Sequence, residues 1–210
     1  MSQSFELIAA QLVSIADGFH RRGWLLGTSG NLSAVVETES LHLAMTPSGV
    51  DKGALVASQI LLIDEQKRII SDHQAKPSDE APLHIRIVKQ RSAGAVFHTH
   101  SVWSTMLSDL HAGDGGLAVE GYEMLKGLAG VRTHEHREWL PILENSQNLE
   151  QLAGKVGEAL NEHVNAHGFL LRRHGLYTWG KDLAEAKRHV EIIEFLLETI
   201  GRTRMLSGKG

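Results

Sequence analysis

The sequence contains no cysteine. The chain can therefore form no disulfide framework, no zinc site with cysteine ligands and no thiol nucleophile. It also lacks an apolar run near the ~18 residues needed to span a membrane. Residues 1–7 lack the basic start and apolar core of a secretory signal. We expect a cytoplasmic protein with no membrane partner.

An excess of positive charge is missing as well. The formal net charge is −4 with histidine neutral, so the chain has no general electrostatic attraction for nucleic acid. An anionic substrate would have to be bound by local donors and dipoles. Apolar residues at 42% and charged residues at 22% are ordinary for a globular protein. The length of 210 residues fits one core, and we expect a single domain over residues 1–210.

Hydrophobic periodicity predicts interspersed helices and strands. Apolar residues recur at helical spacing in residues 5–22, 149–163 and 182–202, and a further helix is expected to start near residue 78. Short apolar segments predict strands at residues 94–100, 168–172 and 176–179, with strand pairs at 32–45 and 60–70. Such a mixture favours a sheet with helices on its faces.

Histidine is abundant, with 13 in the chain. His98 and His100 lie two residues apart at the end of an apolar strand, so both side chains point the same way. His174 follows a second apolar strand and precedes Gly175. If the two strand ends meet at one edge of the sheet, three imidazoles converge there. Three protein ligands with an open position are the pattern of a catalytic zinc site.

A pair of histidines two apart is weak evidence on its own, and the chain contains a second pair. His134 and His136 follow no apolar strand and stand among charged neighbours. We interpret this pair as part of a solvated or interface segment, and we do not expect it to bind the metal.

Three segments rich in small hydroxyl and glycine residues are candidate anion sites. Turns of this kind present backbone N–H groups and hydroxyls to a ligand, and a helix starting near Ser78 would add its N-terminal dipole. Each segment alone is also typical of an ordinary turn, and none matches a P-loop or a dinucleotide fingerprint. The segments are Gly27-Thr28-Ser29-Gly30-Asn31, Thr46-Pro47-Ser48-Gly49 and Pro77-Ser78-Asp79.

Together with Lys76 to Glu80, Ala93 to Ser101 and Arg173-His174-Gly175, these motifs resemble the class II aldolase/adducin family in content and order. The resemblance implies a three-layer α/β/α sandwich with a central mixed, mainly antiparallel sheet. It also implies a homotetramer with active sites between subunits. It further implies one Zn²⁺ per subunit held by His98, His100 and His174, and phosphate contacts from Gly30, Asn31, Ser48, Gly49 and Ser78.

Two positions near residue 80 bear on the chemistry that the resemblance implies. The sugar-phosphate aldolases of the family have a second serine where this chain has Asp79, which puts that part of the phosphate contact in doubt. Glu80 stands where those aldolases have a glutamate that can serve as a fourth metal ligand or as a base.

The segment from Gly121 to Gly127 narrows the resemblance. Its Glu123-Met124-Leu125-Lys126-Gly127 resembles a Glu-Met-x-Lys-Gly stretch of the methylthioribulose-1-phosphate dehydratases, a branch of the family in methionine salvage. In that branch the glutamate is the proposed acid/base, so the resemblance implies a catalytic Glu123. It implies a hydro-lyase that converts 5-methylthioribulose 1-phosphate to 2,3-diketo-5-methylthiopentyl 1-phosphate and water.

Two alternatives remain open from the sequence. An aldolase or epimerase acting on fuculose or ribulose phosphate would use the same metal, and Glu80 keeps that alternative open. A non-enzymatic, adducin-like interaction module would lack an intact metal triad, whereas all three histidines are present here.

Overall fold

The computed structural model describes residues 4–71 and 75–208. Its helices are α1 (Phe5–Arg21), α2 (Ala81–Arg91), α3 (Val102–Leu110), α4 (Leu149–Glu162) and α5 (Leu183–Leu206), with short 3₁₀ segments η1 (Ala57–Gln59), η2 (Ala112–Asp114) and η3 (Glu123–Gly127). Its strands are β1 (Asn31–Glu37), β2 (His42–Met45), β3 (Leu61–Asp64), β4 (Ala95–Thr99), β5 (Gly116–Glu120), β6 (Arg137–Leu143), β7 (Gly168–Leu171) and β8 (Gly175–Gly180).

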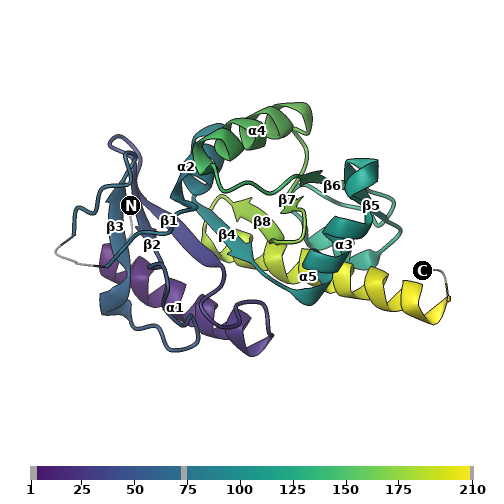
Figure 1. The fold of residues 1–210 in the computed structure, drawn as a ribbon, viewed down its shortest axis with the longest axis horizontal. Coiled ribbons are helices and arrows are strands. Elements are labelled where there is room, and N and C mark those ends of the chain that lie inside the picture. The colour runs from purple at the N-terminus through teal and green to yellow at the C-terminus, as the bar shows by residue number, and fades with distance from the viewer. Residues whose placement is uncertain (1–3, 72–74, 209–210) are drawn as a thin grey trace.

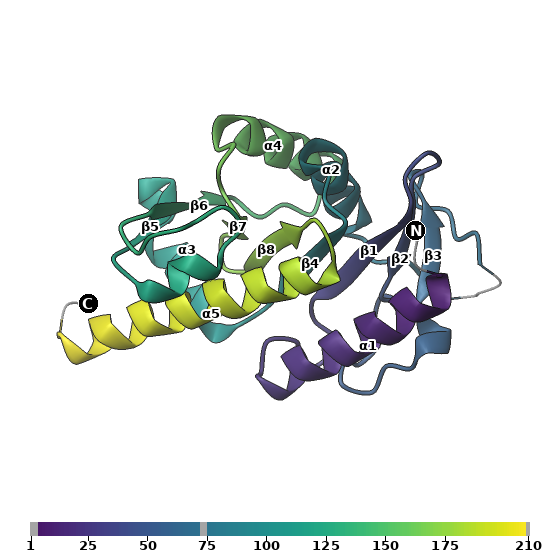
Figure 2. The same ribbon diagram turned by 180° about the vertical axis from the view of Figure 1, so that it is seen from behind.

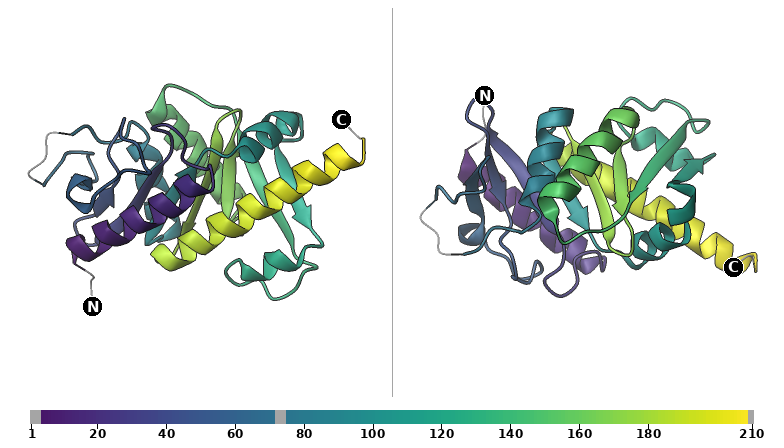
Figure 3. Two further views of the ribbon diagram at one scale, coloured as in Figure 1. Left: turned by 90° about the horizontal axis from the view of Figure 1, so that it is seen from below. Right: turned by 45° about the horizontal axis from the view of Figure 1, so that its top comes forward.

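These strands form one eight-stranded sheet in the order β3-β2-β1-β4-β8-β7-β6-β5. Every neighbouring pair is antiparallel except β6 and β7, which are parallel. Helices α2 and α4 cover one face, while α1 and α5 cover the other (Figures 1 and 2). The three layers are also visible from below and obliquely in Figure 3. The expected α/β/α sandwich with a mixed, mainly antiparallel sheet is confirmed.

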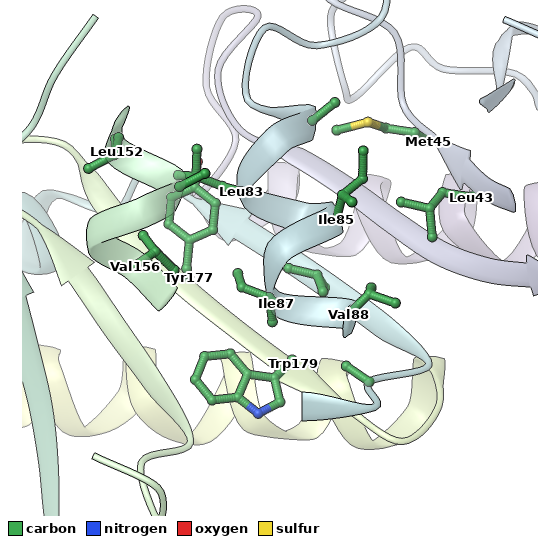
Figure 4. Packing of buried hydrophobic residues seen from close by; sticks show 14 of the residues in the cluster. Leu43, Met45, Leu83, Ile85, Ile87, Val88, Leu152, Val156, Tyr177 and Trp179 are labelled. Carbon is green, nitrogen blue, oxygen red and sulfur yellow. The ribbon is translucent and has the colours of Figure 1, made fainter. Parts of the chain in front are cut away.

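Each face of the sheet has its own hydrophobic core. Under α2 and α4, residues such as Ile87, Val156 and Tyr177 pack between the helices and the sheet (Figure 4). On the opposite face, the buried stripe of α5 includes Ala186 and Val190. Strand β4 contributes to both cores because alternate residues of a central strand face opposite layers.

Helix starts follow the capping rules. The side chain of Asp182 accepts the backbone N–H of Glu185 at 2.8 Å, as the sequence predicts for the start of α5. Ser101 caps α3 in the same way, accepting the N–H of Ser104 at 2.9 Å. Ser101 directly follows His100, so this cap fixes the direction in which the chain leaves the end of β4.

One expectation about strands is wrong, and two strands were not predicted. Residues 60–70 contain one strand, β3, and an isolated bridge joins Ile63 to Ile69 in place of a second strand. The sequence pattern also gave no indication of β5 and β6, which pair over Gly116–Glu120 and Arg137–Leu143. Strand β6 carries Pro141 opposite Gly116, two residue types that weaken a strand pattern. No helix of the described residues is long and apolar enough to cross a membrane.

Two glycines in different surroundings should respond in opposite ways to substitution by alanine. Gly94 lies where the chain before β4 closely approaches the residues before α5, whereas Gly154 has free space around it. A Cβ on Gly94 would lie 2.0 Å from the carbonyl oxygen of Lys181, whereas a Cβ on Gly154, inside α4, would meet nothing within 4 Å. We expect Gly94→Ala to lower the free energy of unfolding by about 1–3 kcal/mol through overpacking. We expect Gly154→Ala to raise it by up to ~1 kcal/mol through helix propensity.

Denaturant unfolding of both variants beside the parent chain measures this difference. A Gly94→Ala variant as stable as the parent would contradict the close packing at this point.

Candidate metal centre and substrate cleft

Three histidine side chains converge at one end of the central strands. His98 lies on β4, His100 is the first residue after β4, and His174 lies in the turn between β7 and β8. The Nε2 atom of His98 is 2.7 Å from Nε2 of His100 and 3.3 Å from Nε2 of His174. The structure thus brings together the three residues that the sequence singled out.

Strand register and one glycine place these side chains. His98 is opposite Asn31 of β1 and opposite Tyr177 of β8. A Cβ on Gly175 would lie 2.1 Å from the carbonyl oxygen of Thr99, so only glycine lets the β7–β8 turn come this close to β4. Arg173, within that turn, has a positive φ of 55°. The tight turn carries His174 against the end of β4.

Burial leaves the three rings neutral. The fully buried His98 donates from Nδ1 to the carbonyl oxygen of Leu176 at 2.9 Å, which leaves the lone pair of its Nε2 facing the other two rings. Burial is the main cause that lowers the pKa of His98 well below its usual value, that of His100 to about 3, and that of His174 as well. Neutral rings with converging lone pairs repel one another unless a cation lies between them. This donor set fits a divalent metal ion.

Glu80 lies against the same three rings. Its carboxylate oxygens are 3.6 Å from Nε2 of His98 and 3.5 Å from Nε2 of His174. The side-chain amide of Asn31 donates to Glu80 at 2.6 Å and to Ser78 at 3.2 Å. A carboxylate held in this way is within reach of a metal bound by the histidines.

A histidine that the sequence analysis did not single out supports this arrangement. His84, on α2, is completely buried, and burial lowers its pKa to about 4. Its Nε2 donates to the side-chain amide oxygen Oδ1 of Asn31 at 2.5 Å, so its Nδ1 accepts from the Ser33 hydroxyl at 2.7 Å. The signal in the sequence was its position four residues after Glu80, which precedes α2 as its N-cap residue. His84 fixes the orientation of the Asn31 amide and, through it, that of Glu80.

A cleft of about 270 Å³ opens beside the histidines. Its wall includes residues of all three candidate anion turns, namely Thr28, Ser29, Gly30, Asn31, Ser48, Gly49, Ser78 and Asp79, together with His100 and His174. The Asp79 side chain is 64% exposed and its carboxylate pairs with Lys76 at 2.7 Å. Its charge is therefore compensated locally, which lessens its conflict with an anionic ligand.

Lys52 is a second residue that the sequence analysis missed. Only 1% exposed, it lines the cleft and donates from Nζ to the carbonyl oxygens of Thr28 at 3.2 Å and Val50 at 2.7 Å. Those bonds use two of its three N–H groups. Among the described residues that line the cleft, Lys52 is the one Lys or Arg. The segment Ser48-Gly49-Val50-Asp51-Lys52 placed it close to an anion turn, but nothing in the sequence showed that it would be buried.

Glu123 is absent from the described lining of this cleft. It begins η3, its side chain is 71% exposed, and its carboxylate pairs with Lys126 and lies 3.9 Å from His134. The hydrogen bond from Lys126 is the main cause that lowers the pKa of Glu123. Within one chain, therefore, Glu123 faces outward and does not join the histidines.

Comparison with curated proteins gives close relatives over nearly the whole chain. A methylthioribulose-1-phosphate dehydratase of Sorangium cellulosum is 41% identical over 196 residues, covering 93% of this chain and 92% of the relative. A protein of the same name from Hahella chejuensis is 41% identical over 194 residues, covering 92% of each.

Comparison with solved structures supports the same fold. An L-fuculose 1-phosphate aldolase superposes with a TM-score of 0.77 at 20% identity, covering 95% of this chain and 87% of the other. A sugar-phosphate aldolase from Thermotoga maritima superposes with a TM-score of 0.71 at 19% identity, covering 96% of each. The family model described as the class II aldolase and adducin N-terminal domain matches residues 10–200. The chain therefore belongs to the class II aldolase and adducin family.

Proposed function

We propose that this chain is a zinc-dependent hydro-lyase of methionine salvage that removes water from 5-methylthioribulose 1-phosphate. The product is 2,3-diketo-5-methylthiopentyl 1-phosphate. The observation that carries the proposal is the set of three neutral, converging histidines beside a donor-rich cleft. The 41% identity to dehydratases over more than nine-tenths of the chain supports the choice of substrate.

His98, His100 and His174 would hold the metal, and Glu80 is close enough to act as a further ligand. A bound zinc ion supplies a Lewis acid that polarises the substrate carbonyl and makes the neighbouring C3 proton more acidic. The remaining tasks fall to the chain. The turns with Gly30, Asn31, Ser48, Gly49 and Ser78, together with Lys52, bind the phosphate and orient the reacting carbons.

Dehydration also needs proton transfer. A base must remove the proton at C3, and an acid must give a proton to the C4 hydroxyl as it leaves as water. The resulting enol becomes the diketone when the proton on its C3 oxygen is lost and C4 gains a proton. We assign both tasks to Glu123. Its exposed position in one chain supports a shared site, in which Glu123 of one subunit reaches the histidine cleft of another. We therefore propose a homotetramer with active sites between subunits.

The metal assignment predicts the effect of removing each ring. We expect the parent protein to bind about one divalent ion per chain, and His98→Ala, His100→Ala and His174→Ala to lose most of it. Elemental analysis of the purified proteins measures this. The matched control is His134→Ala, whose side chain is exposed and lies 3.9 Å from Glu123. Loss of the metal from the control and its retention in the other three would show that the site is elsewhere.

Lys52 gives a prediction about phosphate binding. Lys52→Met keeps much of the side-chain volume but removes the charge beside the proposed phosphate position. Because a hydrogen bond to a charged group contributes about 1.5–3 kcal/mol, we expect KM to rise by at least ~10-fold while metal content stays near normal. Lys89→Met is the control, since Lys89 is exposed and paired with Glu65. An unchanged KM in Lys52→Met would remove Lys52 from the phosphate site.

Glu123→Gln tests the dehydratase assignment most directly. The variant keeps the size of the side chain but loses the titrating group, so it should fold, retain the metal and bind substrate. We expect turnover, followed as the loss of water by mass spectrometry, to fall at least ~10²-fold. If instead Glu80→Gln abolished turnover and Glu123→Gln left it intact, the arrangement would be that of an aldolase or epimerase.

Mixed oligomers test whether Glu123 acts across subunits. Glu123→Gln and His98→Ala chains should each be inactive, but unfolding and refolding them together would combine an intact cleft with an intact Glu123 from another chain. For equal, random mixing, up to about a quarter of the sites would be complete. Absence of any recovered activity would place Glu123 and the histidines of a working site on one chain.

A further inference from the structure

The backbone N–H and C=O of Ala129, two residues after η3, each form a hydrogen bond with a histidine ring. Its N–H donates to Nε2 of His189 at 3.0 Å, and its carbonyl oxygen accepts from Nε2 of His167 at 2.8 Å. His167 directly precedes β7 and His189 lies on α5. Three segments far apart in sequence therefore meet at the backbone of one residue, Ala129, six residues after Glu123.

The fixed roles of backbone groups determine where the protons are. A carbonyl only accepts and an amide N–H only donates. His189 must therefore donate from Nδ1 to the carbonyl oxygen of Trp179 at 2.7 Å and accept at Nε2. His167 must donate from Nε2 to Ala129, while its Nδ1 lies 2.9 Å from a carboxylate oxygen of Glu138. With Glu138 ionised, both nitrogens of His167 donate and the ring is positively charged.

The surroundings of Glu138 support this assignment. The carboxylate is 2% exposed, and it accepts the backbone N–H of His167 at 2.8 Å and Nε2 of His136 at 2.9 Å. No Lys or Arg among the described residues forms an ion pair with it. A buried carboxylate needs a charged partner, and the His167 ring supplies it. Within the segment expected to be solvated or at an interface, His134 and Glu135 are exposed, but the partly buried His136 ring contacts this buried group.

Opposing effects act on the two pKa values. Burial disfavours the charged form of each group, but the mutual hydrogen bond and charge prevail, so the pKa of His167 is raised and that of Glu138 lowered. The other charged or titratable groups around His167 line a separate cleft of about 450 Å³ with it: His136 just before β6, His189 and Glu185 on α5, and Arg91 and Lys181.

Further contacts restrain η3. Leu125 and Leu128 are buried, and the carbonyl oxygen of Gly127 accepts from Nε of Arg188 at 2.8 Å. A Cβ on Gly127 would lie 2.4 Å from Ile192, so η3 packs directly on α5. These contacts fix the side of η3 that faces α5 and the protein interior, while the Glu123 side chain is exposed.

We propose that the charged His167–Glu138 pair is a positioning device. It fixes η3, and with it the Glu123 carboxylate, through the hydrogen bond from His167 to the backbone carbonyl oxygen of Ala129. His167 and Glu138 are positioning residues in this account, because neither lines the histidine cleft. The inference rests on the proposed function, since it matters for turnover only if Glu123 acts on the substrate. When His167 loses its second proton, it can keep only one of its two donor bonds.

The pH dependence follows from the sign of the shift. The clamp, meaning the charged His167 ring bonded to both Ala129 and Glu138, is lost as the pH rises through the raised pKa of His167. On the acid side it is lost as the pH falls through the lowered pKa of Glu138, because the carboxylate then takes up a proton. Turnover should therefore fall on the alkaline side, together with the protection of the amides of residues 123–129 against hydrogen exchange.

Two substitutions test the device. His167→Asn keeps a donor where Nδ1 stands but cannot reach Ala129. We expect kcat to fall roughly 10- to 100-fold through displacement of Glu123, with KM and metal content near normal and faster amide exchange in residues 123–129.

Glu138→Gln instead offers an amide N–H to Nδ1 of a neutral His167, whose Nε2 can still donate to Ala129. In Glu138→Gln, turnover and exchange protection should not decline at alkaline pH as they do in the parent protein. His163→Gln, a half-buried histidine at the end of α4, is the matched control.

Each other outcome overturns the inference. Unchanged kcat and exchange in His167→Asn, or an unaltered alkaline decline in Glu138→Gln, would show that the pair does not position η3. His136, Glu138 and His167 also have ligand atoms within 4.8 Å of one another. A second ion per chain that His167→Asn removes would make the cluster a metal site instead. Failure of the parent protein to dehydrate methylthioribulose phosphate would refute the proposed function, and amide exchange would still decide whether the clamp exists.

Discussion

The antiparallel pairing of β4 with β1 on one side and β8 on the other determines the candidate site. This register places Asn31, His98 and Tyr177 side by side at one end of the sheet. The His98 ring stacks on Tyr177 with centroids 3.9 Å apart, and Tyr177 stacks in turn on Phe169 at 5.0 Å. Because the ring is fully buried and its Nδ1 is bound to a backbone carbonyl, its only free lone pair faces His100 and His174. Moving β4 by one residue would turn His98 to the opposite face of the sheet.

Burial at this position has chemical consequences that exposed histidines would not have. It keeps the rings neutral at ordinary pH, which is the form that binds a metal. It also requires every other polar group nearby to find a partner. The bonds from Ser33 to His84, from His84 to Asn31 and from Asn31 to Glu80 give each of these groups a partner and one orientation, whereas Nδ1 of His174 is buried without a hydrogen-bond partner among the described residues. A packed, polar cluster of this kind can hold ligands in place before any metal or substrate arrives.

The sequence predicted the parts of the site that depend on local pattern. Two histidines separated by one residue at a strand end must point the same way, and small hydroxyl turns provide donors wherever they occur. It did not predict Lys52 or His84, because their burial depends on contacts with chain segments 24 and 53 residues away. Strands β5 and β6 were missed for a related reason. Their pairing, with Gly116 opposite Pro141, is stabilised by packing against α3 and α5 more than by the propensity of their own residues.

The two groups of residues that the proposed chemistry requires occupy different parts of the chain. His100, His174 and the donor turns line the cleft, whereas Glu123 stands on a short 3₁₀ segment beyond β5. A side chain on a flexible loop would lose much conformational entropy on entering another subunit's cleft. Here the segment is fastened from behind by buried Leu125, by Leu128 and by the peptide of Ala129, so little of that cost remains. An exposed carboxylate on a rigid support is therefore expected of a group that acts across a subunit boundary. If Glu123 only formed a surface salt bridge with Lys126, η3 would not need to be fixed in this way.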